Sequence, residues 1–198
     1  MIYALNSVTY QRQEPTPNAR AICPTCDQPV TSKCGKTNAW HWAHISSADC
    51  DSWSEPETEW HAQWKKRFKQ TEVTIARNGK KHRADAQSIQ GQVIEFQHSS
   101  ISAEEIKERN IFYNGAIWVL DCLQAYENDR LVIRRKLNGI IGIRWKQPKR
   151  SFLQNGHTAL YLHTEADLLV KVQKFFVGEI TAGYGQFVTV DDFVRQHA

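Results

Sequence analysis

The most informative pattern of apolar and polar positions lies between residues 82 and 99, HRADAQSIQGQVIEFQHS. Residues 93–98 alternate strictly, so that Val, Glu and Gln share one face of a strand while Ile, Phe and His share the other. The run before them is also strand-like, and residues 89–91 can close a hairpin if Gly91 adopts the left-handed conformation. The sequence therefore predicts two antiparallel strands joined by a short loop.

This hairpin bears two acidic residues whose relative position depends on the loop. A three-residue loop places Asp85 directly opposite Glu95, whereas a two-residue loop turns Asp85 to the other face. Two carboxylates at cross-strand distance repel each other by roughly 0.2–1 kcal/mol, and a shared hard cation removes the repulsion. The pair indicates either a divalent-metal site or a solvated hairpin face.

A helix is predicted upstream of the hairpin. Ser54 can cap it, Pro56 lies in its first turn, and the apolar spacing continues to about Lys69. On this helix we expect an apolar stripe that faces the core and a polar row, with residues four apart, that borders it. The stripe is Trp60, Trp64 and Phe68, and the row is Glu57, His61 and Lys65. By itself, the pair of Glu57 and His61 is also compatible with an ordinary surface contact.

The remaining periodic segments predict a mixed α/β domain. A strand over 72–77 and an Asn78-Gly79 turn precede the hairpin and extend it to a three-stranded meander. Ser102 caps a helix to about residue 112, and an apolar central strand over 116–122 makes the sheet mixed. The last third is expected to hold strands over 131–137, 140–145 and 159–162, a helix over 165–176 and a short helix after Thr189.

The cysteine spacing adds a second kind of chemistry. Four of the five cysteines lie in the first quarter of the chain, where CPTC at 23–26 is followed by HWAH at 41–44 with a small hairpin between them. Two close pairs of sulfur and nitrogen ligands are typical of a structural zinc site. Cys23, Cys26 and His44 are the expected ligands, and the fourth is either His41 or Cys50.

Composition and charge limit the classes of protein to consider. With 198 residues, 41% of them hydrophobic and 23% charged, the chain is expected to form one domain plus a small module. The start of the chain lacks a secretory pattern and no long apolar stretch follows, so we expect a cytoplasmic protein without a membrane partner. Residues 65–83 and 130–150 each contain eight Lys or Arg, which indicates either a polyanionic partner or solvated basic strands.

Taken together, these motifs resemble the competence protein CoiA-like nuclease family, a branch of the PD-(D/E)xK superfamily. The resemblance covers roughly residues 20–122 and keeps the order of its parts. Those parts are CPTC, HWAH, Glu57-Thr58-x-x-His61, His82-Arg83-Ala84-Asp85, Ile94-Glu95-Phe96-Gln97-His98-Ser99 and Arg109-x-x-x-Tyr113 before AIWVLDC.

The resemblance implies a fold and a metal site. The fold would be a restriction-endonuclease-like core, with a mixed central sheet flanked by helices and a small N-terminal zinc module. Asp85, Glu95 and the carbonyl of Phe96 would hold magnesium or manganese, and Glu57 would reach the ion directly or through water. The domains would then be a zinc-finger module at 1–53, a nuclease core at 54–122 and a packed extension at 123–198.

One residue departs from the superfamily pattern. Gln97 stands where a lysine is usual, and glutamine orients water but carries no charge. The missing positive charge could come from Lys65, Lys81 or His61, which could assist the water or the phosphate. Arg109 and Tyr113 resemble helix positions that support the site and meet DNA, although Arg109 could equally form a plain surface salt bridge.

Two functions therefore compete most directly, beside a third possibility, a zinc-stabilised interaction module without a nucleic-acid role in which the carboxylates pair with Arg83 and Arg109. The first is a metal-dependent DNA endonuclease or exonuclease with catalytic residues Glu57, His61, Asp85, Glu95 and Gln97 and a structural zinc. The second is a catalytically weak DNA-binding or DNA-processing accessory protein, which Gln97 favours. Either would bind DNA, single- or double-stranded, and a second copy of the chain or other DNA-processing proteins are further candidate partners.

Overall fold

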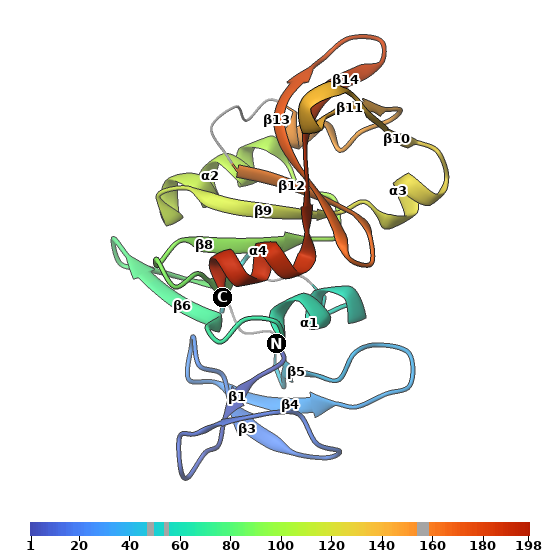
Figure 1. Ribbon diagram of the computed structural model, residues 1–198. Helices are drawn as coiled ribbons and strands as arrows, with labels where there is room; N and C mark the ends of the chain where they lie inside the picture. The colour runs from blue at the N-terminus through green and yellow to red at the C-terminus, as the bar shows by residue number, and fades with distance from the viewer. Residues whose placement is uncertain (47–49, 54–55, 154–158) are drawn as a thin grey trace. The chain divides into compact units, whose positions relative to one another are not determined.

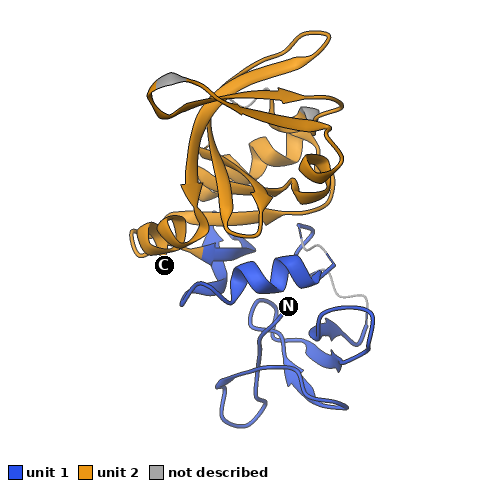
Figure 2. Ribbon diagram, turned by 45° about the vertical axis from the view of Figure 1, so that its right-hand side comes forward, with its two compact units in different colours: residues 1–86 blue, residues 87–198 orange. Residues whose placement is uncertain are grey.

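The computed structural model describes residues 1–46, 50–53, 56–153 and 159–198. The chain forms two compact units, unit 1 at residues 1–86 and unit 2 at residues 87–198 (Figure 2). The three-part division expected from the sequence, with boundaries after residues 53 and 122, stays a prediction.

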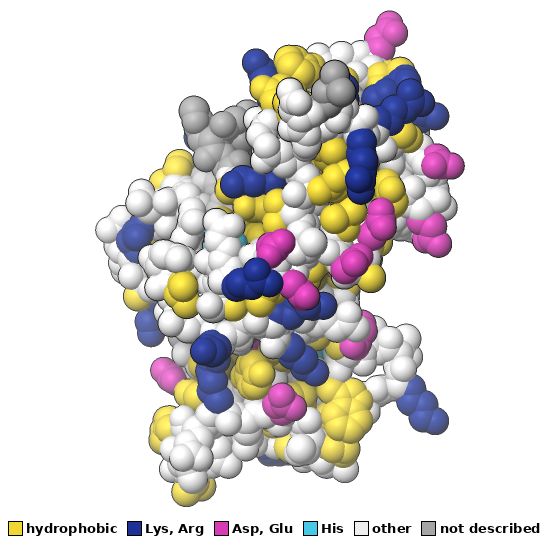
Figure 3. Space-filling view, in the orientation of Figure 1, with side chains coloured by type: hydrophobic (Ala, Val, Ile, Leu, Met, Phe, Trp, Pro, Cys, Tyr) yellow, Lys and Arg dark blue, Asp and Glu magenta, His cyan; other side chains and the backbone are white. Residues whose placement is uncertain are grey.

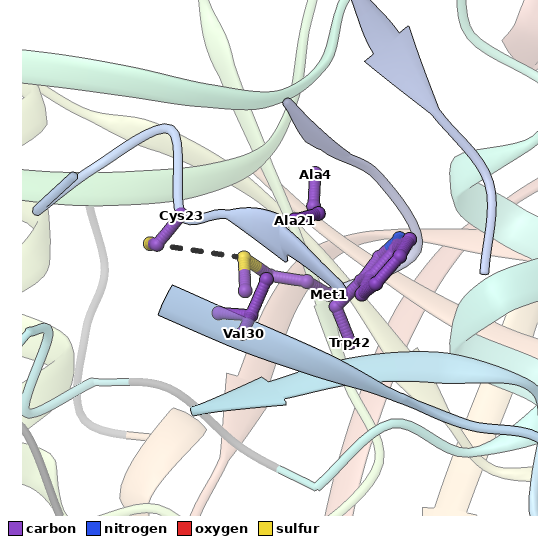
Figure 4. Packing of buried hydrophobic residues seen from close by; sticks show 6 residues of the cluster. All are labelled: Met1, Ala4, Ala21, Cys23, Val30 and Trp42. Carbon is purple, nitrogen blue, oxygen red and sulfur yellow. Dashed lines mark hydrogen bonds between the residues drawn. The ribbon is translucent and has the colours of Figure 1, made fainter. Parts of the chain in front are cut away.

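Unit 1 begins with a small antiparallel sheet in the strand order β2-β1-β3-β4-β5 (Figure 1). Its core is a cluster of six buried residues, in which Val30 and Trp42 pack around Met1 and Cys23 (Figure 4). A core of this size is small for the segment it must hold together, so a bound ion would add to its stability. The strands are β1 (Ala4–Leu5), β2 (Arg12–Gln13), β3 (Arg20–Ile22), β4 (Pro29–Lys33) and β5 (His41–His44).

The helix α1 (Glu59–Lys65) is shorter than the sequence predicts. Thr58 caps it, because its hydroxyl accepts a hydrogen bond from the His61 amide at 3.2 Å. Ser54, the expected cap, lies outside the described residues, and the helix ends before Lys69. The prediction of its ends was therefore wrong, and Glu57 precedes the helix although it still faces the first turn.

Unit 1 ends with a hairpin of two strands, β6 (Thr71–Arg77) and β7 (Lys80–Gln87). Asn78 and Gly79 join them with φ angles of +50° and +74°, the left-handed pair that a two-residue hairpin turn requires. The turn predicted from the Asn-Gly dipeptide is confirmed. The strand pairing then fixes which residues of β7 point toward α1.

Unit 2 opens with the predicted strand, helix and parallel strand. A loop at 89–91 has Gly91 at φ +81°, and the Ser88 amide donates to the Gln92 carbonyl at 2.8 Å across it. The three-residue loop with a left-handed glycine is therefore confirmed. The elements that follow are β8 (Val93–Gln97), α2 (Ala103–Tyr113), capped by Ser102, and β9 (Ala116–Asp121), which pairs with β8 in parallel.

The remainder of unit 2 completes a seven-stranded mixed sheet in the order β10-β11-β14-β13-β12-β9-β8 (Figure 1). The helix expected over 165–176 is wrong, because residues 168–176 form a strand paired on both sides. Its sequence, LLVKVQKFF, is rich in β-branched and aromatic residues that suit a sheet. The elements are α3 (Leu123–Glu127), β10 (Leu131–Arg135), β11 (Ile140–Trp145), β12 (Ala159–Glu165), β13 (Leu168–Phe176), β14 (Thr181–Thr189) and α4 (Val190–His197), with short 3-10 turns at Leu137–Gly139 and Arg150–Phe152.

The core of unit 2 lies between this sheet and its helices. Trp118 is fully buried on β9, stacks edge-on against Phe152 and donates its indole N–H to Asn110 of α2 at 3.0 Å. Phe193 of α4 packs on Tyr161 of β12. The mixed α/β class predicted from the sequence is confirmed. At 11 residues α2 is the longest described helix, about half the length that a membrane span needs.

Candidate functional site

Four side chains in the first part of unit 1 form a candidate metal site. The ligand atoms of Cys23, Cys26, His44 and Cys50 all lie within 4.8 Å of one another. The knuckle that carries the first two cysteines is a tight turn, in which the Asp27 amide donates to the Cys23 carbonyl at 3.0 Å. The Thr25 amide points at the Cys23 sulfur at 3.4 Å.

The spacing within this cluster fits a zinc ion. Tetrahedral zinc with Zn–S bonds of about 2.3 Å and Zn–N bonds of about 2.0 Å separates two sulfurs by about 3.8 Å and a sulfur from a nitrogen by about 3.5 Å. The Sγ atoms of Cys23 and Cys50 are 3.6 Å apart, and Cys26 Sγ is 3.2 Å from His44 Nε2. The cluster could therefore hold zinc with no large rearrangement.

Of the two residues that the sequence left open as the fourth ligand, Cys50 lies in the cluster and His41 does not. His41 and His44 are three residues apart on strand β5, so the pleat turns their side chains to opposite faces. His41 Nδ1 instead lies 2.8 Å from the Ala39 carbonyl. The HWAH spacing would bring both histidines to one ion only in a turn or helix, and this segment is an extended strand.

The protonation equilibria of the cluster agree with a cation site. Burial, followed by the neighbouring thiols of Cys26 and Cys23, raises the pKa of the Cys50 thiol. Three adjacent thiolates oppose one another, and a divalent cation would stabilise them together. Burial, followed by Arg83, lowers the pKa of His44, which favours the neutral imidazole that binds zinc.

The segment that carries Cys50 is anchored to β7 by residues that our sequence analysis did not assign. Asp51 accepts two hydrogen bonds, from the Arg83 amide at 2.7 Å and from His82 Nδ1 at 2.9 Å. Trp53 stacks on the His82 ring with centroids 3.4 Å apart. The dipeptide Cys50-Asp51 gave no recognisable motif, because its partners lie about thirty residues further along the chain.

A second cluster in unit 1 surrounds Asp85, the acidic residue of β7. His61 Nε2 lies 2.8 Å from Asp85 Oδ2, and His61 Nδ1 lies 3.6 Å from Glu57 Oε1. The side chains of Glu57 and His61 are almost fully buried, so the predicted polar row does not border the core but lies inside it. The predicted site residues Glu57, His61, Lys65 and Asp85 are thus brought together.

Lys65 is the cation at the centre of this cluster. Three carboxylates surround its ammonium group, at Nζ distances of 3.0 Å to Glu57, 3.1 Å to Glu72 and 3.3 Å to Asp85. Burial acts to lower the pKa of Lys65, but these carboxylates outweigh it and raise the pKa. The lysine is therefore held as an ammonium ion in a site that remains rich in negative charge.

Glu72 was not predicted as part of this cluster. Its carboxylate accepts the amides of Ile2 and Tyr3, both at 2.9 Å, in addition to the Lys65 ammonium. The Met1 amino group lies 3.2 Å from Glu57 Oε2 and 3.9 Å from Glu72 Oε1. In the sequence Glu72 is an isolated acidic residue in a strand, so nothing marked it as buried.

In unit 2 the predicted acidic residue Glu95 is paired with Arg109. Arg109 Nη1 donates to Glu95 Oε2 at 2.7 Å, and both side chains are nearly inaccessible to solvent. The guanidinium group also binds Glu105 one helical turn earlier. Burial acts to lower the pKa of Arg109, but Glu95 and then Glu105 raise it. Arg109 is therefore the partner of a buried carboxylate and does not form a plain surface salt bridge.

The other predicted residues occupy less distinctive positions. The side-chain amide of Gln97 donates to Ser99 twice, to the backbone carbonyl at 3.2 Å and to the side-chain hydroxyl at 3.4 Å. Tyr113 is buried at the end of α2, where its ring meets Phe112. Lys81 is exposed on β7, where it lies opposite Ala76 of the neighbouring strand β6.

The candidate metal site lies in a segment that matches a protein-family model. Residues 9–52 match the family model described as competence protein CoiA, N-terminal domain. The resemblance to CoiA is thus confirmed for this segment, which contains all four residues of the metal cluster. The part of the chain where the resemblance implied a nuclease core lies outside the match to CoiA. No curated protein and no solved structure matches the chain.

Proposed function

We propose that the protein is a metal-dependent DNA nuclease, CoiA-like, that hydrolyses phosphodiester bonds at a site centred on Asp85. The observation that carries the proposal is the convergence of His61 and Lys65 on this carboxylate within unit 1. A carboxylate that can bind a hard cation, an imidazole that can accept a proton and a fixed positive charge are the groups that phosphodiester hydrolysis uses. Titratable groups gathered in one buried cluster are candidates for a functional site.

In this proposal Lys65 supplies the charge that Gln97 lacks. Its ammonium group is 3.3 Å from Asp85 Oδ1, whereas Lys81 is exposed. His61 would accept a proton from the attacking water, since Asp85 fixes one of its ring nitrogens at 2.8 Å. Of the three candidates that the sequence left open, the proposal assigns the positive charge to Lys65 and proton transfer to His61. Lys81 has no role in it.

The metal would be held by carboxylates from two parts of the chain. The sequence pattern of the hairpin predicts that Asp85 stands opposite Glu95 when the loop has three residues. Asp85, Glu95 and the Phe96 carbonyl, with Glu57, would then offer the oxygen ligands that magnesium or manganese prefers. Such an ion lowers the pKa of bound water and neutralises charge on the scissile phosphate. Arg109, which donates to Glu95 Oε2 at 2.7 Å, would hold this carboxylate in position.

A specific observation favours the alternative, an accessory protein that binds DNA without cutting it. The Gln97 amide is turned to the local backbone at Ser99, and the carboxylates of both units already have cationic partners. Buried ion pairs of this kind can serve the fold alone. In this alternative the clusters around Lys65 and Arg109 are structural, and DNA is held by basic surfaces.

The proposed zinc ion has a structural role in either case. The cluster has four protein ligands, which leaves no position for a substrate or a reactive water. We propose that it holds the CoiA-like segment in its fold, and that this segment helps the protein to bind DNA.

The two functions are separated by one comparison of variants. Asp85→Asn combined with Glu95→Gln removes two carboxylates of the proposed metal site. Glu104→Gln combined with Glu108→Gln removes the same charge from two exposed positions of α2. Cleavage of plasmid and single-stranded DNA in magnesium or manganese, and DNA binding, would be measured for both.

For a nuclease, the first variant stops cutting while its DNA affinity holds or rises, and the control cuts like the native protein. For an accessory protein, the native protein and both variants bind DNA and none cuts it. Circular dichroism and thermal unfolding of each sample would show whether lost cutting reflects lost folding.

A further inference from the structure

We propose that the outer face of strands β10, β11, β14 and β13 in unit 2 is a binding surface for single-stranded nucleic acid. The face, which we term the basic-aromatic face, bears four cations and two aromatic rings. They are Arg134, Lys136, Arg144, Lys174, Phe176 and Tyr184. This surface contains part of the basic run at 130–150 that the proposed nuclease site does not use.

Strand register places these residues side by side. One row across the four strands runs Arg134, Gly142, Tyr184 and Lys174, each directly opposite the next. The neighbouring row on the same face, two residues along each strand, runs Val132, Arg144, Ala182 and Phe176. Since side chains directly opposite each other on paired strands share a face, both rows point the same way.

The other face of these strands is the core. Leu131, Ile141, Ile143 and Trp145 alternate with the outward residues and are almost completely buried. In Figure 3, Lys and Arg side chains lie beside hydrophobic ones over the end of the molecule where Figure 1 draws these strands. The basic-aromatic face is thus the solvent side of strands whose other side contributes these buried residues to the core.

The charge of this face is of one sign. The four strands, which lie wholly within the described residues, contain no Asp or Glu, so these strands offer no opposite charge to the cations. Positive residues on an edge strand such as β10 can serve to prevent edge pairing. Arg144 and Lys174 lie on the inner strands β11 and β13, where that explanation does not apply.

A glycine lies next to the aromatic rings of the face, and a lysine side chain covers it. Gly142 has no side chain between Arg134 and Tyr184, and the Lys136 side chain runs over it, with Cε 2.8 Å from where a Cβ would stand. The Lys136 side chain therefore covers the backbone at the centre of the face and brings its ammonium group there, with Nζ 3.5 Å from the same point.

The two rings suit unpaired bases. Phe176 is 52% exposed, and its ring lies 6.2 Å from that of Tyr184 at an interplanar angle of 34°. Lys174 Nζ lies 5.2 Å from the Phe176 centroid, so a cation accompanies the ring. Aromatic side chains on a sheet, flanked by Lys and Arg, stack successive bases and bind the phosphates between them. A duplex hides the faces of its bases, so a single strand is the better match.

The test measures binding of single strands by fluorescence anisotropy over a range of salt concentrations. The full chain would be mixed, without added magnesium, with a labelled oligothymidylate of about 20 nucleotides, longer than the roughly 4–16 nucleotides that one such sheet domain covers. Arg134→Ser is compared with Arg135→Ser, because Arg135 is the next residue of the same strand and lies on the opposite face, against Phe187.

Arg134→Ser is expected to weaken binding and to reduce the slope of log affinity against log salt by about 0.7, the loss of one phosphate contact on a single strand. Arg135→Ser should leave the slope unchanged. Tyr184→Val should weaken binding by roughly 5- to 150-fold with no change in slope, since a stacking contact releases no ions. Tyr184→Phe should bind like the native protein.

Equal effects of Arg134→Ser and Arg135→Ser, an unaffected Tyr184→Val, or equally tight binding of a duplex would each overturn the proposal in favour of a solvated basic sheet. An oligouridylate of the same length shows whether RNA or DNA is preferred. The result is independent of cleavage. A protein that cuts DNA but ignores these substitutions keeps the nuclease and loses this face, and one that cuts nothing but responds to them does the reverse.

Discussion

Glu72 is a buried residue whose ionisation depends on the charges around it. Its backbone φ is +50°, a left-handed conformation that glutamate seldom adopts, and its side chain is 1% exposed. Burial acts to raise the pKa of Glu72, but Lys65, followed by the Met1 amino group, lowers it to about 2. The ionised carboxylate joins the start of the chain to α1 and β6, which explains why a charged residue is retained in the core.

The stability of the protein is therefore expected to depend on Glu72 in a defined pH window. A carboxyl group whose pKa falls from 4.5 to about 2 on folding contributes about 3 kcal/mol to the free energy of unfolding above pH 4.5. This contribution is lost as the pH falls from 4.5 to about 2. Urea unfolding of the native protein and Glu72→Gln would measure it.

In this comparison the variant should be less stable at neutral pH and lose less stability on acidification. Release at low pH of a metal ion held by the Cys/His cluster would affect both proteins and would cancel in the difference. Glu104→Gln, which changes an exposed carboxylate of α2, should follow the native curve. A variant with the native pH dependence would show that Glu72 is not coupled to folding in this way.

At the scale of elements, the conformation of strand β5 decides which histidine joins the candidate metal cluster. Because residues of a strand alternate between faces, His44 can reach Cys26 only if His41 points away from it. Cys50 takes the remaining position, and Asp51 fixes it to β7 through two hydrogen bonds. The site thus joins the small N-terminal sheet to the β6–β7 hairpin of unit 1.

This account predicts opposite outcomes for two single substitutions. Cys50→Ser should lower the zinc content below one ion per chain and reduce the melting temperature, since three ligands hold the ion less tightly than four. His41→Asn should keep its zinc and most of its stability. Metal analysis by mass spectrometry, with thermal unfolding, would measure both. Loss of zinc from His41→Asn with retention in Cys50→Ser would contradict the assignment.

Elements with local determinants were predictable from the sequence. The Asn78-Gly79 turn, the Gly91 loop and the helix capped by Ser102 all depend on residues that act on their immediate neighbours. The strand at 168–176 was taken for a helix because a short apolar run suits either structure until its pairing partners are known. The shortened α1 likewise reflects a cap, Thr58, that competes with an equally plausible Ser54.

The candidate sites were predictable only in part, for the same reason. Spacing identified Cys23, Cys26 and His44, but the choice between His41 and Cys50 required the strand geometry. Residues far apart in sequence, such as Asp51 with His82 or Glu72 with Ile2, meet only in the folded chain. Buried charge was the least predictable feature, since i,i+4 spacing describes a solvated row and a buried one equally well.

At the scale of the whole molecule, the proposals assign three roles to three different parts of the chain. A structural zinc would stabilise the CoiA-like segment, the carboxylates around Asp85 would carry the chemistry, and the basic-aromatic face would bind the strand. The net charge of +4 is modest, so the affinity for DNA is expected to come from local concentrations of Lys and Arg. Of these roles, cleavage at Asp85 is central, because the other two also suit a binding protein.

The most direct test of that claim is the rate of DNA cleavage as a function of manganese concentration, for the native protein and for Asp85→Asn with a confirmed fold. We predict that cutting by the native protein requires the ion and that the substitution slows it by at least about 100-fold, the scale of loss when a group that stabilises the transition state is removed. Cutting at the native rate by Asp85→Asn, or no cutting by the native protein at any manganese concentration, would contradict the account.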